Sequence, residues 1–514
     1  MSLRAANILV LFFLCIGLSS VAWANPPSSP PEDEAGWGDD DDDDDAFDES
    51  SLPDLKPDTT VHNSPWSMTG TLRSRWGMWL ERLDEDPFAK GRQSLDLRLE
   101  MARDMWLFRA EVHGEYDLAY LVNRSDYDPA TLETYEWLVR SGEIFGRARP
   151  GNVEVTVGRQ VIAWGEGDAL SPLDWINPRD SREFGLADLD DLRLPILATR
   201  LAVFFGGHRL ELVGVHETDF GLIASPRGPF SPFNTVLASF ESTALGPLLS
   251  EKTFALEHRQ GRFSLDQQEV FFRWVYRGPG IDLGLQVGSF LDRQGVFEFP
   301  GMDVLALQDS VELRVDHRRY TAFGHSGAWA LDSFLLKWEL GADLNRSVNT
   351  GSLAVDLPAG ADAGTLLEAM TDAGALLEAI PSPSTGESTL LHSMIGLTWS
   401  GVQDLRLSVE FGKSWVLDGA TDLALPMEDP ILLLRGSYDM MRERLQLSAA
   451  ASLIGWTVDG GWLFRADVSY EVLDGFKVGL GGVTYQPSDE FGPLYGLDTH
   501  DRVFAWLRWD FRVM

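Results

Sequence analysis

Apolar and polar residues alternate along many short segments of the chain. Leu72, Trp76 and Met78 fall on one face of an extended segment, whereas Arg73 and Arg75 fall on the other. The same alternation recurs in 95–102, 108–113, 462–471 and 505–513. A period of two predicts β-strands that present one apolar and one polar face.

Eighteen strands follow from this alternation, with sixteen as the alternative count. The predicted strands are 67–80, 93–103, 106–118, 132–141, 152–163, 196–205, 208–217, 267–276, 281–291, 310–322, 328–344, 390–400, 403–415, 430–440, 444–455, 460–472, 476–486 and 501–513. Short turns follow most even-numbered strands, although the turn at 142–151 is longer. The long connections follow odd-numbered strands, at 164–195, 218–266, 292–309, 345–389 and 487–500. This parity requires 252–259 to be a loop.

Even strand numbers, short turns at one edge and long loops at the other are typical of bacterial outer-membrane barrels. A soluble β-sandwich or propeller is the competing interpretation of the alternation. The apolar faces are rich in aromatic residues near strand ends, as an interfacial girdle requires. No segment after the N-terminal region has 18 uncharged apolar residues, which excludes membrane-spanning helices. We therefore predict an all-β protein, a transmembrane antiparallel β-barrel over 65–514.

The first 24 residues have the pattern of a secretory signal peptide. Arg4 precedes an apolar run at 8–18, and the small residues Ala22 and Ala24 predict cleavage after Ala24. Cys15 is the single cysteine of the chain and lies inside this segment. The mature protein is therefore expected to have no disulfide and no thiolate metal site.

Residues 25–64 are predicted to be a disordered periplasmic tail. The stretch 25–60 carries fourteen acidic residues and one lysine, a net charge of −13. Its densest part is a run of seven aspartates, Asp39, Asp40, Asp41, Asp42, Asp43, Asp44 and Asp45. Repulsion between such charges prevents a core, so a solvated spacer is the simplest interpretation. The alternative is that the run binds Ca²⁺ or a basic periplasmic partner.

The net charge of the chain, −37, excludes nucleic acid as a natural partner, because phosphate binding needs a basic surface. The expected surroundings are outer-membrane lipid and lipopolysaccharide, and the barrel assembly machinery. A periplasmic or inner-membrane transport component is a further expected partner.

The least generic part of the sequence is the strand and loop over 157–195. It contains Gly-Arg-Gln at 158–160, Trp-Gly-Glu at 164–166, Asn-Pro-Arg-Asp at 177–180 and Leu-Pro at 194–195. These motifs, with a hairpin at 277–285, resemble the DUF1302 family of outer-membrane proteins. Weaker agreement extends over 66–514, and the Asp-rich tail and the terminal Met514 depart from the family pattern. The resemblance implies a porin-like barrel and no settled substrate.

The loop 164–195 is long enough to fold into the barrel and narrow it, which would set selectivity through charged side chains. The candidate residues of this constriction are Arg159, Trp164, Glu166, Asp168, Asn177, Arg179 and Asp180. Candidate lumen residues of the wall are Arg73, Arg75, Arg98, Glu100, Arg109 and Glu111, and the polar strand faces add Arg314 and Glu312. The alternative is that the loop residues only brace the wall.

A ten-residue repeat in the connection 345–389 predicts helix. Its units are 363–370 and 373–380, and together they form an apolar stripe. A helical lid over the mouth of the barrel is the simplest account, and a docking face for a partner or for lipid is the alternative.

The sequence offers little support for an enzyme. The histidines lack metal-ligand spacing, and no nucleophile elbow or phosphate-binding glycine loop occurs. Glu166 and Asp168 could in principle form a glycosidase pair, but paired acids are common in acidic loops. The leading hypothesis is therefore a channel. The alternatives are an outer-membrane component of a lipid or polysaccharide export system, and a structural or adhesive barrel with a plugged lumen.

Overall fold

The computed structural model describes residues 64–83, 87–183, 185, 192–231, 252–298, 310–350, 384–420, 423, 428–487, 494 and 496–513. The predicted signal peptide, all but the last residue of the predicted acidic tail and the repeat at 363–380 lie outside these residues. Within them, no helix has the length and apolar character needed to cross a bilayer.

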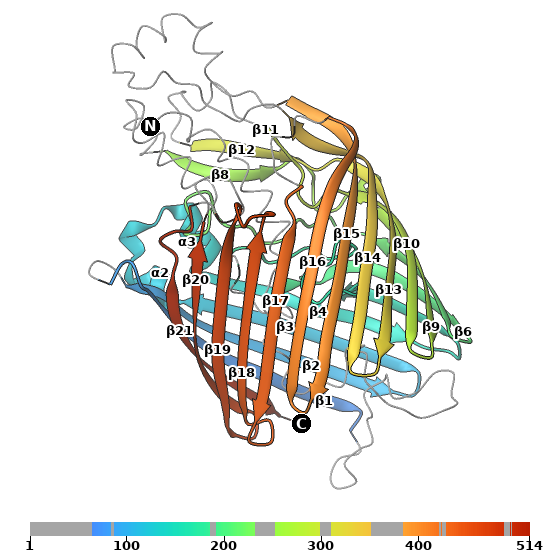
Figure 1. Ribbon diagram of the computed structural model, residues 1–514, viewed down its shortest axis with the longest axis horizontal. Coiled ribbons are helices and arrows are strands. Elements are labelled where there is room, and N and C mark those ends of the chain that lie inside the picture. The colour runs from blue at the N-terminus through green and yellow to red at the C-terminus, as the bar shows by residue number, and fades with distance from the viewer. Residues whose placement is uncertain are drawn as a thin grey trace, which may run out of the picture.

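Within the described residues, 18 strands form one antiparallel sheet that closes on itself, because β21 pairs with β1 as well as with β20. Figure 1 shows the resulting barrel, with the first and last strands side by side. The strands are β1 (Trp66–Trp79), β2 (Phe88–Arg103), β3 (Trp106–Asp117), β4 (Trp137–Ala148), β5 (Val153–Gln160), β6 (Ile196–Phe205), β7 (His208–Val215), β9 (Glu269–Gly278), β10 (Ile281–Leu291), β13 (Arg319–Leu331), β14 (Phe334–Thr350), β15 (Ser384–Val402), β16 (Leu405–Gly419), β17 (Ile431–Met440), β18 (Leu445–Ile454), β19 (Gly461–Leu473), β20 (Phe476–Gln486) and β21 (Arg502–Arg512). The predicted strand number and barrel closure are confirmed.

The connections alternate between the two edges of the barrel as predicted. One edge has turns of two to four residues, such as 104–105, 206–207 and 474–475. The other edge has the longer connections, including 161–195 and 216–268. Asp104 in the first of the short turns has a φ of 51°, a left-handed conformation that aspartate tolerates better than most residues. We call the two sides the short-turn edge and the long-loop edge.

The strands present apolar residues outward and polar residues inward. Leu72, Trp76 and Met78 of β1 are 44%, 42% and 45% exposed. Arg73 and Arg75, which alternate with them, face the interior of the barrel. Closure of the barrel leaves no unpaired sheet edge, and the outward apolar belt can face lipid. Together these are the features of a transmembrane barrel.

One predicted strand, 132–141, begins as a helix. The residues of α3 (Pro129–Tyr135) precede β4, and the turn predicted at 142–151 is mostly part of that strand. Asp128 caps the helix by accepting a hydrogen bond of 3.0 Å from the Thr131 N–H, and Pro129 stands at the first helical position. These are ordinary helix-start signals that the alternation concealed. The same connection contains α2 (Leu118–Val122) and the short helix η3 (Arg124–Asp126).

The predicted strand 310–322 is two elements. Its first half is β12 (Ser310–Asp316), which pairs with β8 (Thr253–His258) and β11 (Val296–Glu298) in a separate sheet on the long-loop side (Figure 1). The prediction that 252–259 is a loop was wrong, because most of it is a strand of this small sheet. The alternation of short and long connections still holds, because that strand is not part of the barrel. The 3₁₀ turn η4 (Leu265–Gln267) follows.

Arg314 and Glu312 were predicted to face the lumen, and this was wrong. Both lie on β12 outside the barrel, with side chains 50% and 55% exposed. The error has a physical reason, since the small sheet also buries alternate residues.

Candidate functional site

The connection between β5 and β6 enters the barrel and crosses it. Asn177 fixes the base of this loop. Its Oδ1 accepts a hydrogen bond from the Ile162 N–H at 2.7 Å, and its Nδ2 donates to the carbonyl oxygens of Leu194 and Gln160 at 2.8 and 3.2 Å. One amide side chain thus joins the start, the middle and the end of the connection. We call residues 161–183 the inner loop.

Glu339 of β14 holds the inner loop against the far wall. Its carboxylate accepts backbone N–H groups of Glu166, Gly167 and Leu173 at 2.5, 2.7 and 3.1 Å. The hydroxyl of Ser171 donates to it at 3.1 Å. Glu339 is 0% exposed, so these loop groups are the hydrogen-bond partners of its carboxylate in place of bulk water.

Glu410 of β16 makes a second attachment of the same kind. It accepts the N–H groups of Asp168, Ala169 and Leu170 at 2.5, 3.1 and 2.9 Å. Among the described residues, six backbone amides of the inner loop therefore point at two wall carboxylates. These acids specify the loop conformation over 166–173, because backbone N–H groups inside the barrel need acceptors and the two carboxylates supply them.

Two acidic side chains of the inner loop pair with cations of the wall. Asp168 accepts a hydrogen bond from Lys337 Nζ at 2.6 Å, and its side chain is 33% exposed. Glu166 lies 3.2 Å from Arg273 and accepts a hydrogen bond from Ser326 at 3.2 Å. The predicted residues Glu166 and Asp168 thus sit on the inner loop, facing cations on β9 and β14.

Trp164 and Trp175 anchor the inner loop in an apolar cluster. Trp164 is 2% exposed and meets Phe271 edge to face at 6.0 Å, while Arg273 lies over its ring at 5.7 Å. Trp175 stacks on Phe290 at 5.6 Å. Ile162, Leu173 and Ile176 of the inner loop belong to the same cluster. Residues of β6, β7, β9, β10 and β13 complete it from the wall. The inward face of these strands is apolar where the loop covers it, an exception to the polar lining expected from the sequence.

Ion pairs hold the second half of the inner loop, residues 174–182. Asp174 receives Arg179 and Arg193, each at 2.8 Å. Burial would raise the pKa of Asp174, but these two guanidinium groups outweigh it and bring the pKa below its usual value. Arg182 pairs with Asp180 at 2.6 Å and with Glu115 of β3 at 2.7 Å.

Arg159 is the last residue but one of β5 and lies where the inner loop begins. It pairs with Glu217, beyond β7, and donates to the carbonyl oxygen of Pro195 at 2.7 Å. Arg159 thus links the end of the connection between β5 and β6 to the start of the connection that follows β7.

Most of the remaining candidate residues form ion pairs between neighbouring strands from β1 to β4. Arg98 pairs with Glu111 at 2.5 Å. Arg109 pairs with Glu100 at 3.0 Å and with Glu143 at 2.9 Å. On β1, Arg73 lies 3.7 Å from Asp96, and Arg75 stands opposite Arg92 in register.

Sequence reasoning did not single out Glu339 and Lys337, which attach the inner loop, although it placed Glu410 among the acids of the lumen. Glu339 and Lys337 alternate with apolar neighbours on β14, so their inward direction was predictable. The partners were not predictable, because Glu339 accepts backbone amides and Lys337 binds the Asp168 carboxylate, all about 170 positions away in the chain. Within the part of the chain that the structure describes, no group of three or more His, Cys, Asp or Glu residues is placed to hold a metal ion.

A histidine pair lies at one end of the small outer sheet. His317 Nδ1 donates to the carbonyl oxygen of Asp292 at 2.6 Å, so its Nε2 accepts from His258 Nδ1 at 2.8 Å. Phe220 stacks on the His317 ring. Burial lowers the pKa of His317 to about 3, and burial also lowers the pKa of His258. Both rings are therefore neutral at pH 7.

This pair predicts an acid-sensitive sheet. In the opened state the histidines regain a pKa of about 6.5, so that state binds more protons below this pH. The stability contributed by the pair is full above about pH 6.5 and falls as the pH drops toward 3. We expect amide protection factors of 253–258 and 310–316, corrected for intrinsic exchange, to be lower at pH 5 than at pH 7.5. Equal protection at both pH values, with His317→Gln also without effect, would contradict this account.

Comparisons with known proteins give a family match and several solved structures of low similarity. The family described as "Protein of unknown function (DUF1302)" matches residues 63–424. No curated protein matches the chain. Similar solved structures include Pseudomonas aeruginosa OccK2 (OpdF) in complex with glucuronate, with 11% identity and a TM-score of 0.46 over 87% of this chain and 98% of that one. Acinetobacter baumannii OccAB1 has 11% identity and a TM-score of 0.47 over 87% and 97%. These likenesses say nothing about a solute.

Proposed function

We propose that this chain, which belongs to the DUF1302 family, is an outer-membrane channel whose charged lumen is constricted by the inner loop. The observation that carries the proposal is the attachment of this loop to the opposite wall through Glu339 and Glu410. A loop fixed at its root and again across the barrel divides the interior and limits what can pass.

Two features support an aqueous path beside the loop. Barrels of 16 to 18 strands are wide enough to keep a channel after side chains fill the wall. Inward-facing charges reach water, since the side chains of Arg98 and Asp96 are 41% and 36% exposed. Charges of both signs line this part of the barrel, which suits polar or charged solutes better than apolar ones.

The orientation follows from the two edges. Outer-membrane barrels keep their short turns on the periplasmic side and their long loops outside. We therefore place the short-turn edge, with the C-terminal end of β21, in the periplasm. The acidic tail before Trp66 would then be periplasmic, where it could meet Ca²⁺ or a basic transport component.

Solute passage is tested with proteoliposomes of the full mature chain. We expect purified protein to raise the permeability of liposomes to small charged solutes well above that of empty vesicles. A folded barrel, shown by its heat-modifiable electrophoretic mobility, that leaves permeability at the empty-vesicle level would refute the channel. The structural or adhesive alternative would then be favoured.

A separate experiment addresses the export alternative, which rests on the acidic tail. Deleting 25–60 should leave the permeability of proteoliposomes unchanged if the tail only recruits a partner. Loss of a transport phenotype in cells, with normal permeability in vitro, would support a role in an export apparatus. A normal phenotype in both assays would make the tail a spacer.

A further inference from the structure

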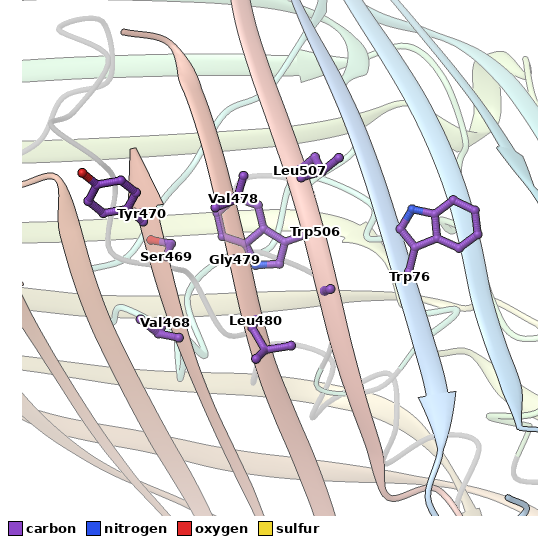
Figure 2. A pocket seen from close by; sticks show the side chains of 10 residues that line it. Trp76, Val468, Ser469, Tyr470, Val478, Gly479, Leu480, Trp506 and Leu507 are labelled. Carbon is purple, nitrogen blue, oxygen red and sulfur yellow. The ribbon is translucent and has the colours of Figure 1, made fainter. Parts of the chain in front are cut away.

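An apolar groove lies on the outer surface of the barrel, away from the lumen. It crosses β19, β20, β21 and β1 and has a volume of about 470 Å³. Figure 2 shows the side chains that line it. Those that shape it are Trp76, Val468, Tyr470, Leu480, Ala505 and Leu507.

The groove has a simple cause in the strand register. Ala505 stands between Leu480 on one neighbouring strand and Trp76 on the other. Leu480 and Trp76 are 59% and 42% exposed, so they project outward on both sides of a single methyl group. A low point bounded by two large apolar side chains accepts a thin, flexible apolar group.

The groove runs obliquely to the membrane normal, because it crosses barrel strands that are tilted by about 35–45°. It spans three strand-to-strand steps, from β19 to β1, which is roughly 14 Å at about 4.8 Å per step. The hydrocarbon core of a bilayer is about 30 Å thick, so one leaflet provides roughly half of that. The groove is therefore about as long as the ordered part of one acyl chain.

A turn with two arginines lies beside one end of the groove. Tyr470 pairs with Leu445, which directly follows the turn 441–444 at the short-turn edge. This turn contains the exposed residues Arg442 and Arg444 with the exposed Glu443 between them, so its net charge is +1. The Glu471 N–H donates to the Arg444 carbonyl at 2.7 Å. Guanidinium groups are well suited to bind phosphate oxygens.

The backbone of the same turn is unusual. Three consecutive non-glycine residues, 441–443, have φ values of 56°, 60° and 65°. L-residues rarely adopt this left-handed conformation, and such geometry concentrates at sites with a function. The turn thus places two exposed arginines, on a backbone of left-handed conformation, next to the Tyr470 end of the groove.

We propose that the groove binds one acyl chain of an anionic phospholipid in the periplasmic leaflet, with the phosphate held by Arg442 and Arg444. The leaflet assignment rests on the orientation given under the proposed function. A second copy of the chain is a poorer occupant, because a stable interface needs about 800 Å² of matching surface on each partner. Side chains that project on both sides of Ala505 keep a flat sheet face out of the groove.

The test is native mass spectrometry of the full mature chain, released from nanodiscs that contain palmitoyl-oleoyl phosphatidylglycerol and phosphatidylethanolamine. We expect one retained phosphatidylglycerol per barrel. Ala505→Trp should fill the groove and lower the retained fraction by about tenfold or more, a loss of at least 1.4 kcal/mol. Ala449→Trp is the matched control, since Ala449 is also exposed on the apolar belt and lies outside the groove.

The charge of the turn is tested separately. Arg442→Gln with Arg444→Gln should abolish the preference for phosphatidylglycerol over phosphatidylethanolamine, whereas Arg103→Gln at another short turn should not. Equal lipid retention by wild type and Ala505→Trp would overturn the proposal. So would a lipid-free dimer that Ala505→Trp dissociates, because a second copy would then be the occupant. Neither readout depends on conductance, so failure here leaves the channel untouched.

Discussion

Replacing both wall glutamates, as Glu339→Gln with Glu410→Gln, is expected to release the inner loop and increase conductance. The two carboxylates accept hydrogen bonds from six backbone amides of the loop among the described residues. Hydrogen bonds to a charged group contribute about 1.5–3 kcal/mol each, and a neutral amide is a weaker acceptor with one oxygen in place of two. A net loss of about 2 kcal/mol would make the detached loop more than tenfold more frequent.

The measurement is single-channel recording in planar bilayers. The double variant should show frequent transitions to a larger conductance that the wild type reaches rarely. Glu312→Gln is the control, because Glu312 is an exposed acid of the small outer sheet and touches no part of the inner loop. A double variant with wild-type conductance and normal folding would show that these acids brace the wall without setting the constriction.

The second large effect is expected from the tryptophans of the inner loop. Truncating a buried tryptophan to alanine costs about 3–5 kcal/mol. Trp164→Ala with Trp175→Ala removes the contacts with Phe271 and Phe290 and leaves Arg273 without the aromatic face beneath it. We expect the amides of 161–176 to lose most of their protection from hydrogen exchange, while the barrel strands keep theirs.

Two further variants make this result specific. Among the described residues the Trp164 Nε1–H has no hydrogen-bond partner, so Trp164→Phe should retain much of the protection. Trp329→Ala removes a tryptophan that is 46% exposed on the outer surface and should leave the inner loop unchanged. If exchange of 161–176 is unaltered in the double alanine variant, the loop owes its position to other contacts.

The barrel was predictable because its main signal is local. Alternation with a period of two, and the parity of short and long connections, hold over most of the residues that the structure describes, and both depend on neighbouring residues. The errors arose where another structure has the same local pattern. Residues 310–316 alternate because the small outer sheet also has one buried face, and 132–135 are helical because Asp128 and Pro129 start a helix.

The site was predictable in part for the same reason. The alternation puts Arg98 and Arg109 on the polar strand faces, where they pair with Glu111 and Glu100, and turn chemistry singled out the connection after β5. The attachment of the inner loop was not predictable, because Glu410 and Leu170 meet across 240 positions of sequence. Every residue except proline has the same backbone N–H, so the sequence of the loop does not indicate which wall residue accepts its hydrogen bonds.

The most direct test of the constriction is a cysteine at position 168. The mature chain is expected to lack cysteine, since Cys15 lies in the predicted signal peptide. In Asp168→Cys, a charged methanethiosulfonate reagent adds bulk at a partly exposed position of the inner loop, and Ala449→Cys places the same label on the apolar belt. The account predicts a stepwise fall in single-channel conductance on labelling position 168 and no change on labelling position 449. Complete labelling of position 168 with unchanged conductance would contradict it.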